Sequence, residues 1–182
     1  MDINTFMKAC AVSTSMATRW SDAVSAAMAL YDISTPAQQA AFLAQVGHES
    51  ASFVFTTELW GPTPTQLTYE PPSQKATDLG NTQPGDGSLF RGRGLIQITG
   101  RYNYQQVSNA LGNDYVSNPA QLAQVSDAAQ SAAWFWNTKG LNQFCTGDPA
   151  DFITMTQRIN GGTNGLADRQ SRWTTAKLAL GA

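Results

Sequence analysis

The sequence has little charge, almost no glutamate and few residues that bind metals. Only 13% of its 182 residues are charged, and one histidine and two cysteines are present. A single histidine excludes zinc sites with two histidine ligands, and two cysteines without metal-ligand spacing form neither a zinc site nor a disulfide framework. We therefore expect no metal and no cofactor. Three glutamates are present, and all lie in one short segment: Glu49, Glu58 and Glu70.

Long hydrophobic runs and an excess of cations are also missing. No apolar run reaches the roughly eighteen residues that span a bilayer, and the first residues lack a cationic start followed by an apolar stretch. We expect no stable membrane insertion, no secretory signal and a monomer that folds in the cytoplasm of its producer. The net charge of −2 argues against nonspecific nucleic-acid binding, which depends on neutralising phosphates.

Helical patterns dominate what is present. Thr35 and Pro36 are a typical N-cap and first helical residue, and glycines end several of the patterns. The length fits one domain over residues 1–182, with no separate binding domain. We expect a mainly α fold in which Trp134, Phe135 and Trp136 belong to the core. The predicted helices cover residues 15–31, 37–50, 126–139, 149–160 and 166–180.

The segment between the second of these helices and residue 90 has a different composition. It holds five of the eight prolines, which is typical of a binding loop. Residues 95–98, LIQI, form the best strand candidate, and alternation along it directs Gln97 and Thr99 to the same side. Such a pair can orient a sugar N-acetyl group or a water. The alternative is an edge strand whose polar side faces solvent.

Two of the glutamates have different surroundings. Glu49 shares a helix face with Phe42 and Val46, at the negative end of the helix, and both burial and the dipole favour its protonated form. Glu58 follows after the helix has ended, where a more solvated, ionised carboxylate is expected. Glycoside hydrolysis requires at least two carboxyl groups in different environments. The alternative is that neither glutamate is catalytic: Glu49 is then a residue at a helix end, and Glu58 is a residue of a surface loop.

Three further polar residues and one aromatic residue invite a functional interpretation. Arg169 lies on the apolar stripe of the last helix, so it needs a carboxylate or carbonyl partner, unless its head reaches water. Asn103 lies on an apolar helix face, where it binds substrate or caps a backbone. His48 lies beside Glu49 on a neighbouring face and is either structural or part of the site. Trp60, in the loop, is a candidate for stacking on a sugar ring.

Five motifs occur in order along the chain: FLAQVGHESASF (42–53), ELWGPTPTQLTYE (58–70), FRGRGLIQITGRYNY (90–104), AAWFW (132–136) and RINGGTNGLADR (158–169). Together they resemble glycoside hydrolase family 19, which includes plant and bacterial chitinases and many bacteriophage endolysins. The resemblance extends from about residue 36 to residue 173. The step of nine residues from Glu49 to Glu58 resembles the phage-type members more than the plant enzymes, and so does the segment WGPTP.

This resemblance implies a two-lobed, lysozyme-like helical domain with a cleft and a small β-hairpin near residues 57–98. It implies that Glu49 is the general acid and Glu58 the general base of an inverting reaction, with Thr99 helping to hold the attacking water. Arg169 matches an arginine that orients the catalytic carboxylates, but plant members carry a carboxylate at the position of Asn164. The residues that match substrate-contacting positions are Gln97, Tyr102, Asn103 and Asn160.

The function expected from these observations is that of a phage endolysin that hydrolyses the β-1,4 bonds of peptidoglycan glycan strands. Such an enzyme is expected to wait in the host cytoplasm and to reach the periplasmic cell wall once the inner membrane is permeabilised. The first alternative is a bacterial chitinase, because chitin and peptidoglycan share N-acetylglucosamine in β-1,4 linkage. The second is a wall-binding module without catalytic activity.

Overall fold

The computed structural model describes all 182 residues, and its regular structure is entirely helical. Two short 3-10 helices, η1 (Pro119–Ala123) and η2 (Leu141–Phe144), flank α8. No helix combines the length and apolar character needed to cross a membrane. The ten α-helices are α1 (Ile3–Cys10), α2 (Thr14–Leu30), α3 (Pro36–Glu49), α4 (Pro64–Leu67), α5 (Gln74–Asp78), α6 (Asp86–Leu89), α7 (Arg101–Leu111), α8 (Val125–Thr138), α9 (Pro149–Asn160) and α10 (Leu166–Leu180).

The predicted mainly helical architecture is confirmed, and α9 and α10 have the predicted bounds. Local chemistry explains these ends. A capping box of Thr35 and Gln38 begins α3, and Gly161, in the left-handed conformation, ends α9. The sequence patterns missed α1 and the three short helices α4 to α6 within the proline-rich segment. These helices have eight residues or fewer, which is too short for a clear helical period.

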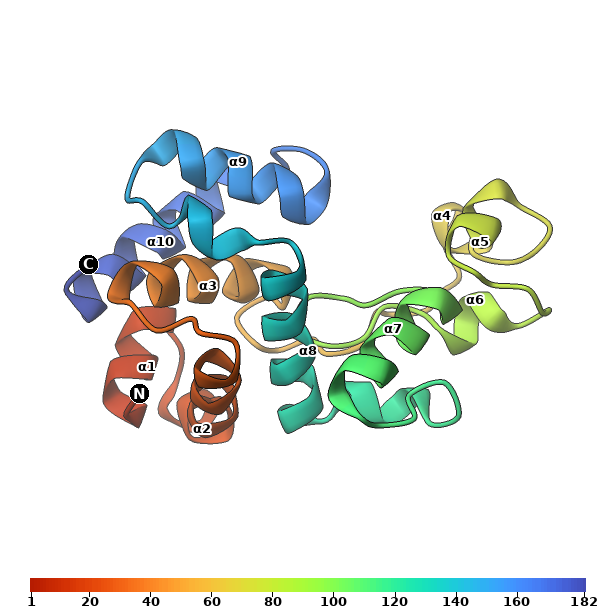
Figure 1. The fold of residues 1–182 in the computed structure, drawn as a ribbon, viewed down its shortest axis with the longest axis horizontal. Helices are drawn as coiled ribbons and strands as arrows, with labels where there is room; N and C mark the ends of the chain where they lie inside the picture. The colour runs from red at the N-terminus through yellow and green to blue at the C-terminus, as the bar shows by residue number, and fades with distance from the viewer.

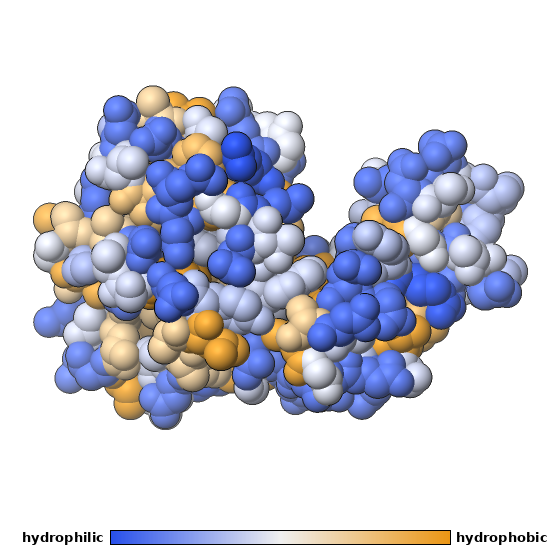
Figure 2. All heavy atoms as spheres, viewed as in Figure 1, coloured by the Kyte–Doolittle hydropathy of each residue, from blue (hydrophilic) through white to orange (hydrophobic).

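The helices form a larger and a smaller lobe (Figure 1). Helices α1, α2, α3, α8, α9 and α10 surround one cluster of 28 buried residues that includes Trp20, Phe42 and Trp136. The smaller lobe contains α4 to α7 and a second cluster of only six buried residues, centred on Phe90 and Tyr104. A broad notch separates the lobes above α7 and α8 (Figure 2).

The predicted β-hairpin near residues 57–98 is absent. Only two isolated antiparallel bridges are formed, from Arg93 to Thr57 and to Ile98. Gly94, with φ of +91°, turns the chain at once, and Leu95 and Ile96 are both buried. Strand alternation is therefore wrong for this segment, because two adjacent side chains enter the larger core rather than opposite faces of a sheet.

Candidate active site

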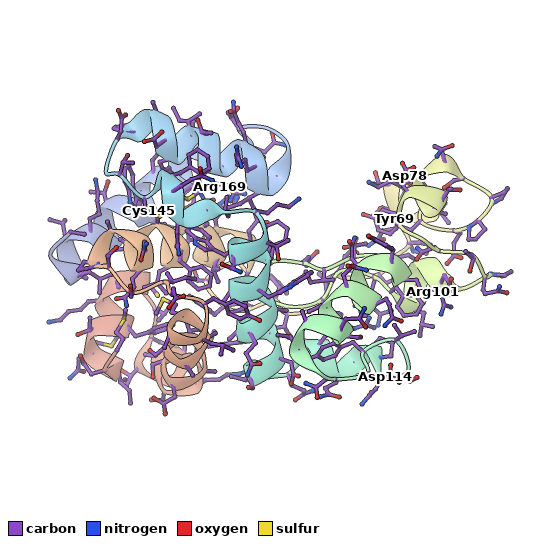
Figure 3. All side chains as sticks on the ribbon, viewed as in Figure 1. Tyr69, Asp78, Arg101, Asp114, Cys145 and Arg169 are labelled. Carbon is purple, nitrogen blue, oxygen red and sulfur yellow. The ribbon has the colours of Figure 1, made fainter.

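Glu49 is the last residue of α3, and it faces Arg169 of α10. The Nη2 atom of Arg169 lies 2.5 Å from Oε1 of Glu49. The arginine side chain is only 2% exposed, whereas that of Glu49 is 22% exposed and therefore open to a ligand. The helical stripe predicted that Arg169 needs a partner, and the structure supplies the carboxylate of Glu49. Figure 3 places Arg169 in the larger lobe, below α9.

A network of buried polar groups holds Arg169 in this position. Its Nη1 donates to Oε1 of Gln45 at 2.6 Å, and its Nε donates to the carbonyl of Asn164 at 3.2 Å. The amide of Gln45 donates in turn to Thr156 of α9 at 2.8 Å. Each of these buried groups has a partner, as the cost of burying polar groups requires. Three helices thus fix one guanidinium against Glu49.

Sequence reasoning missed Gln45 and Thr156 in this network. The pattern that identifies Gln45 is present in the sequence, since it lies one helical turn before Glu49 on a stripe with Phe42. The sequence argument for a protonated Glu49 counted burial and the helix dipole, but not the guanidinium. The contact with the guanidinium is a feature of the site that only the structure shows.

Glu58 lies on the segment that leads from the larger lobe to the smaller one. Its Oε2 accepts from the backbone N–H of Gly92 at 2.9 Å, and its Oε1 accepts from Nε2 of Gln66 at 2.9 Å. The side chain is half-buried, so it is less solvated than the sequence suggested. Each of the two carboxyl oxygens thus accepts one hydrogen bond from the protein. Gln66, 4% exposed, was not identified from the sequence.

A pocket of about 360 Å³ lies between α7 and α8, beside the notch. Four residues predicted from the sequence line it: Gln97, Thr99, Tyr102 and Asn103. Gln97 and Thr99 therefore share an environment as predicted, although no strand places them there. Gly92 lies between the pocket and Glu58. Its N–H donates to Glu58, and its backbone lies so close to the pocket residue Gln97 that a Cβ on Gly92 would be only 2.5 Å from Oε1 of Gln97.

The opposite wall of this pocket comes from α8. Trp134 and Phe135 are half-buried: they pack against the buried clusters and also line the pocket, whereas Trp136 is fully buried. Lys139 follows α8 and is the only charged side chain that lines the pocket. It lies 5.6 Å from the ring of Phe135 and forms no ion pair with a carboxylate.

Comparison with known proteins agrees with this arrangement. A family 19 model described as chitinase class I matches residues 14–162, which include both glutamates and the pocket. The chain belongs to glycoside hydrolase family 19. A Haemophilus influenzae protein named for a family 19 glycosyl hydrolase domain is 36% identical over 156 residues, covering 72% of this chain and 74% of that protein.

Other family 19 proteins are more distant or longer. An endochitinase of Arabidopsis thaliana is 37% identical over 124 residues, and the match covers 68% of this chain but 39% of the plant protein. Chitinase C from Streptomyces griseus has a TM-score of 0.76 at 20% identity, over 100% of this chain and 76% of its own. A class IV chitinase from Zea mays has a TM-score of 0.66 at 23% identity, over 88% of this chain and 81% of its own. The two structures show the family 19 fold.

Two further site residues predicted for this family 19 chain, His48 and Asn160, lie in the last turns of α3 and α9. His48 is half-buried, and its Nδ1 is 2.7 Å from Asp168. Asn160 organises the loop after α9: its amide donates to the carbonyl of Asn164 at 3.0 Å, and its oxygen accepts from the N–H of Gly162 at 2.7 Å. The carbonyl of Asn164 also accepts from Nε of Arg169, so this residue contacts the arginine through its backbone.

Trp60 belongs to the smaller lobe and contacts Tyr69, with ring centroids 6.3 Å apart. Burial and the nearby carboxylate of Glu58 raise the pKa of Tyr69, so its hydroxyl stays neutral at physiological pH. Figure 3 places Tyr69 across the notch from Arg169. The aromatic pair therefore stands in the smaller lobe on the side of Glu58.

Glu70, the third glutamate, has a structural role. Its Oε2 accepts from the N–H of Gly85 at 2.8 Å, and its Oε1 accepts from the N–H of Ser88 at 3.2 Å. These donors lie at the start of α6, where unpaired N–H groups favour an acid. The cluster of glutamates in the sequence thus divides into two candidate site residues and one residue that stabilises a loop.

Proposed function

We propose that this family 19 hydrolase is an endolysin that cleaves the β-1,4 bonds of bacterial peptidoglycan by inversion. The observation that carries the proposal is the contrast between the two carboxyls. Glu49 is held by side chains of the larger lobe, and Glu58 is held by a backbone N–H and an amide on the way to the smaller lobe. An inverting mechanism needs one acid and one base with a water between the base and the sugar.

In this proposal Glu49 protonates the glycosidic oxygen while Glu58 takes a proton from the attacking water. Thr99, in the pocket next to Gln97, holds that water together with Glu58. The pocket residues Tyr102 and Asn103 bind the sugar on one side, and Trp60 stacks on it from the smaller lobe. Neither proton transfer requires a metal or a cofactor. Host cell lysis follows once the enzyme, accumulated in the cytoplasm, reaches the cell wall.

Lys139 favours peptidoglycan over chitin as the substrate. It is the only charged residue of the pocket and has no carboxylate partner within the protein. Peptidoglycan carries carboxylates on its peptide substituents, and on the lactyl group where no peptide is attached, whereas chitin carries none. An unpaired cation beside the sugar site therefore gains an interaction only with the wall polymer. The sequence resemblance of WGPTP to phage-type members supports the same choice.

A second candidate function is that of a chitinase. It is supported by the relatives named endochitinases, of which the Arabidopsis protein is one. Both polymers contain N-acetylglucosamine in β-1,4 linkage, so the glutamates serve either substrate. The third possibility, a module that binds the wall without cleaving it, is disfavoured because Glu49, Glu58 and Thr99 are all present.

The decisive experiment digests purified peptidoglycan and chitin oligomers and identifies the new reducing ends by mass spectrometry. We expect cleavage of peptidoglycan, loss of most turnover in Glu49→Gln and Glu58→Gln, and retention of most turnover in Glu70→Gln, which serves as the matched control. Near-full activity of Glu49→Gln would overturn the acid assignment. Products from chitin alone would identify a chitinase, and binding without products would identify a wall-binding module. Turbidity of permeabilised Gram-negative cells provides a rapid parallel test.

A further inference from the structure

The chain makes an unusual turn directly after Glu49. Three consecutive residues other than glycine adopt positive φ angles there: Ala51 at +49°, Ser52 at +61° and Phe53 at +67°. Residues with a Cβ avoid this left-handed region, so a run of three persists only where the surroundings hold it. Local hydrogen bonds, such as that from the N–H of Ser52 to the carbonyl of Gly47 at 2.7 Å, hold the turn together with contacts of its side chains to other helices.

Two side chains of the turn provide these contacts. Phe53 is 1% exposed and packs in the larger core, with its ring centroid 5.3 Å from that of Phe6 and 5.8 Å from that of Trp20. Ser52 points the other way, and its Oγ accepts a hydrogen bond from Nη1 of Arg172 at 2.9 Å. Phe53 thus secures the turn to α1 and α2, and Ser52 secures it to α10.

Arg172 is connected to the other side of Glu49 through Asp168. The Nε of Arg172 donates to Oδ2 of Asp168 at 2.7 Å, and the same oxygen lies 2.7 Å from Nδ1 of His48. Oδ2 of Asp168 thus contacts both His48, which precedes Glu49, and Arg172, which binds the turn after Glu49. Burial disfavours the charged form of Asp168, but the hydrogen bonds from Arg172 and His48 outweigh it and lower its pKa.

The ring of His48 has little freedom to leave this position. A Cβ placed on Gly165 would lie 2.2 Å from Cε1 of the ring, so the imidazole lies directly against the glycine backbone. An ionised Asp168 can only accept hydrogen bonds, so Nδ1 of His48 must carry the proton in this contact. The contact therefore also specifies the tautomer of the histidine next to Glu49.

We propose that Asp168 is a positioning residue for Glu49, acting through His48 on one side and through Arg172 and Ser52 on the other. This inference rests on the proposed role of Glu49 as the acid. The side chain of Asp168 is 50% exposed, and ion pairs of such exposed groups contribute little to stability. Its removal therefore affects the direction of the Glu49 carboxyl more than the stability of the fold.

The test compares Asp168→Ala with Asp151→Ala. Asp151 is a matched control because it occupies the first turn of α9, as Asp168 does in α10, and accepts one side-chain hydrogen bond, from Thr146. Steady-state kinetics on peptidoglycan fragments should show kcat lowered about 10- to 100-fold in Asp168→Ala, because small misplacements of a reacting group have effects of this order. KM should change less than about threefold, and the melting temperature should fall by less than about 4 °C.

Two further measurements separate positioning from a general structural role. Ser52→Ala removes the same connection from the side of the turn and should lower kcat in the same direction, by about three- to tenfold. His48 is the only histidine, so its ring ¹⁵N shifts are unambiguous. These shifts should show the proton on Nδ1 of His48 in the wild type and in Asp151→Ala. In Asp168→Ala the preference for the Nδ1 tautomer should be lost.

Each outcome decides between the two proposals. A lower kcat with nearly unchanged KM and melting temperature, together with loss of the Nδ1 tautomer, supports the role of Asp168. An unchanged kcat in Asp168→Ala overturns it, as does a loss of kcat that Asp151→Ala reproduces. Near-full activity of Glu49→Gln instead overturns the proposed function, and positioning of Glu49 by Asp168 is rejected with it.

Discussion

The two lobes hold their site residues by different physical means. In the larger lobe long helices surround 28 buried residues, and Glu49 extends from the end of one of these helices toward a buried arginine. In the smaller lobe the core has six buried residues, the helices preceding α7 have five residues or fewer, and Glu58 is held by Gln66 and a backbone N–H. A polar network between long helices positions the proposed acid, whereas hydrogen bonds of short segments position the proposed base.

This contrast explains where polar residues are buried. The smaller lobe compensates for its small core with an ion pair between Asp86, which is 2% exposed, and Arg101, whose Nε lies 2.9 Å from the carboxylate. Asn81, 3% exposed, donates to the carbonyl of Tyr69 at 2.9 Å and accepts from the N–H of Arg101 at 2.8 Å. A lobe held in this way should respond to loss of single polar groups and to pH more strongly than the larger lobe, except at Arg169.

The largest effect is expected for Arg169→Met. The change leaves Gln45 without a donor and Glu49 without a counter-charge, so the unfolding free energy should fall by roughly 2–4 kcal/mol. Activity should also be lost. Denaturant unfolding and turnover measure both, and Arg158→Met is the control because Arg158 is exposed. Wild-type stability of Arg169→Met would show that the buried network contributes little to the larger lobe.

Gln66→Met tests the corresponding support of Glu58. The amide of Gln66 donates to Glu58 and to the carbonyl of Leu59 at 2.7 Å, and methionine fills a similar volume without these bonds. We expect a loss of about 1–3 kcal/mol, because buried partners are left unsatisfied. The kcat value should fall about tenfold. The control is Gln130→Met on α8, whose amide bonds only to Ser126. Equal kcat values for the two variants would contradict the role of Gln66.

Acid should loosen the smaller lobe first. Burial raises the pKa of Asp86, but hydrogen bonds from Arg101, Gln83 and Thr82 outweigh it and hold the pKa below its ordinary value of 3.8. Asp86 therefore contributes stability that is fully present above this value and is lost as the pH falls through the pKa of the folded protein. Amide hydrogen exchange at about pH 5 and about pH 2.5 should show protection lost earlier in α6 and α7 than in α2 and α8. Uniform loss would contradict this.

The smallest effect is expected for Lys139→Gln. An exposed cation contributes well under about 1 kcal/mol, so KM on peptidoglycan should rise only about two- to fivefold, and less at high salt. KM on uncharged chitin oligomers should not change. Lys8→Gln, on α1, is the control for removal of one exposed charge. An equal change on both substrates would show that Lys139 does not distinguish them.

Much of the helical architecture is predictable from the sequence, because it depends on local chemistry. Thr35 and Pro36 identify the start of α3, and Gly161 identifies the end of α9. Arg169 is identifiable as a residue that needs a partner, since a cation on an apolar helix stripe cannot be buried alone. The hairpin prediction failed because LIQI carries a strand-like pattern, while Gly94 turns the chain and both Leu95 and Ile96 enter the larger core.

The sequence by itself determined the mainly helical class, the two carboxyls with different surroundings and the polar residues of the pocket. These features depend on helical periods, caps and motifs, each of which lies within a short segment of the chain. Only the tertiary structure decided the partners. Gln45 and Arg169 are 124 positions apart, and Ser52 and Arg172 are 120 apart, so no local pattern joins them. Packing of α3 against α10 brings these groups together, and the cost of burying unpaired polar groups then selects which of them bond.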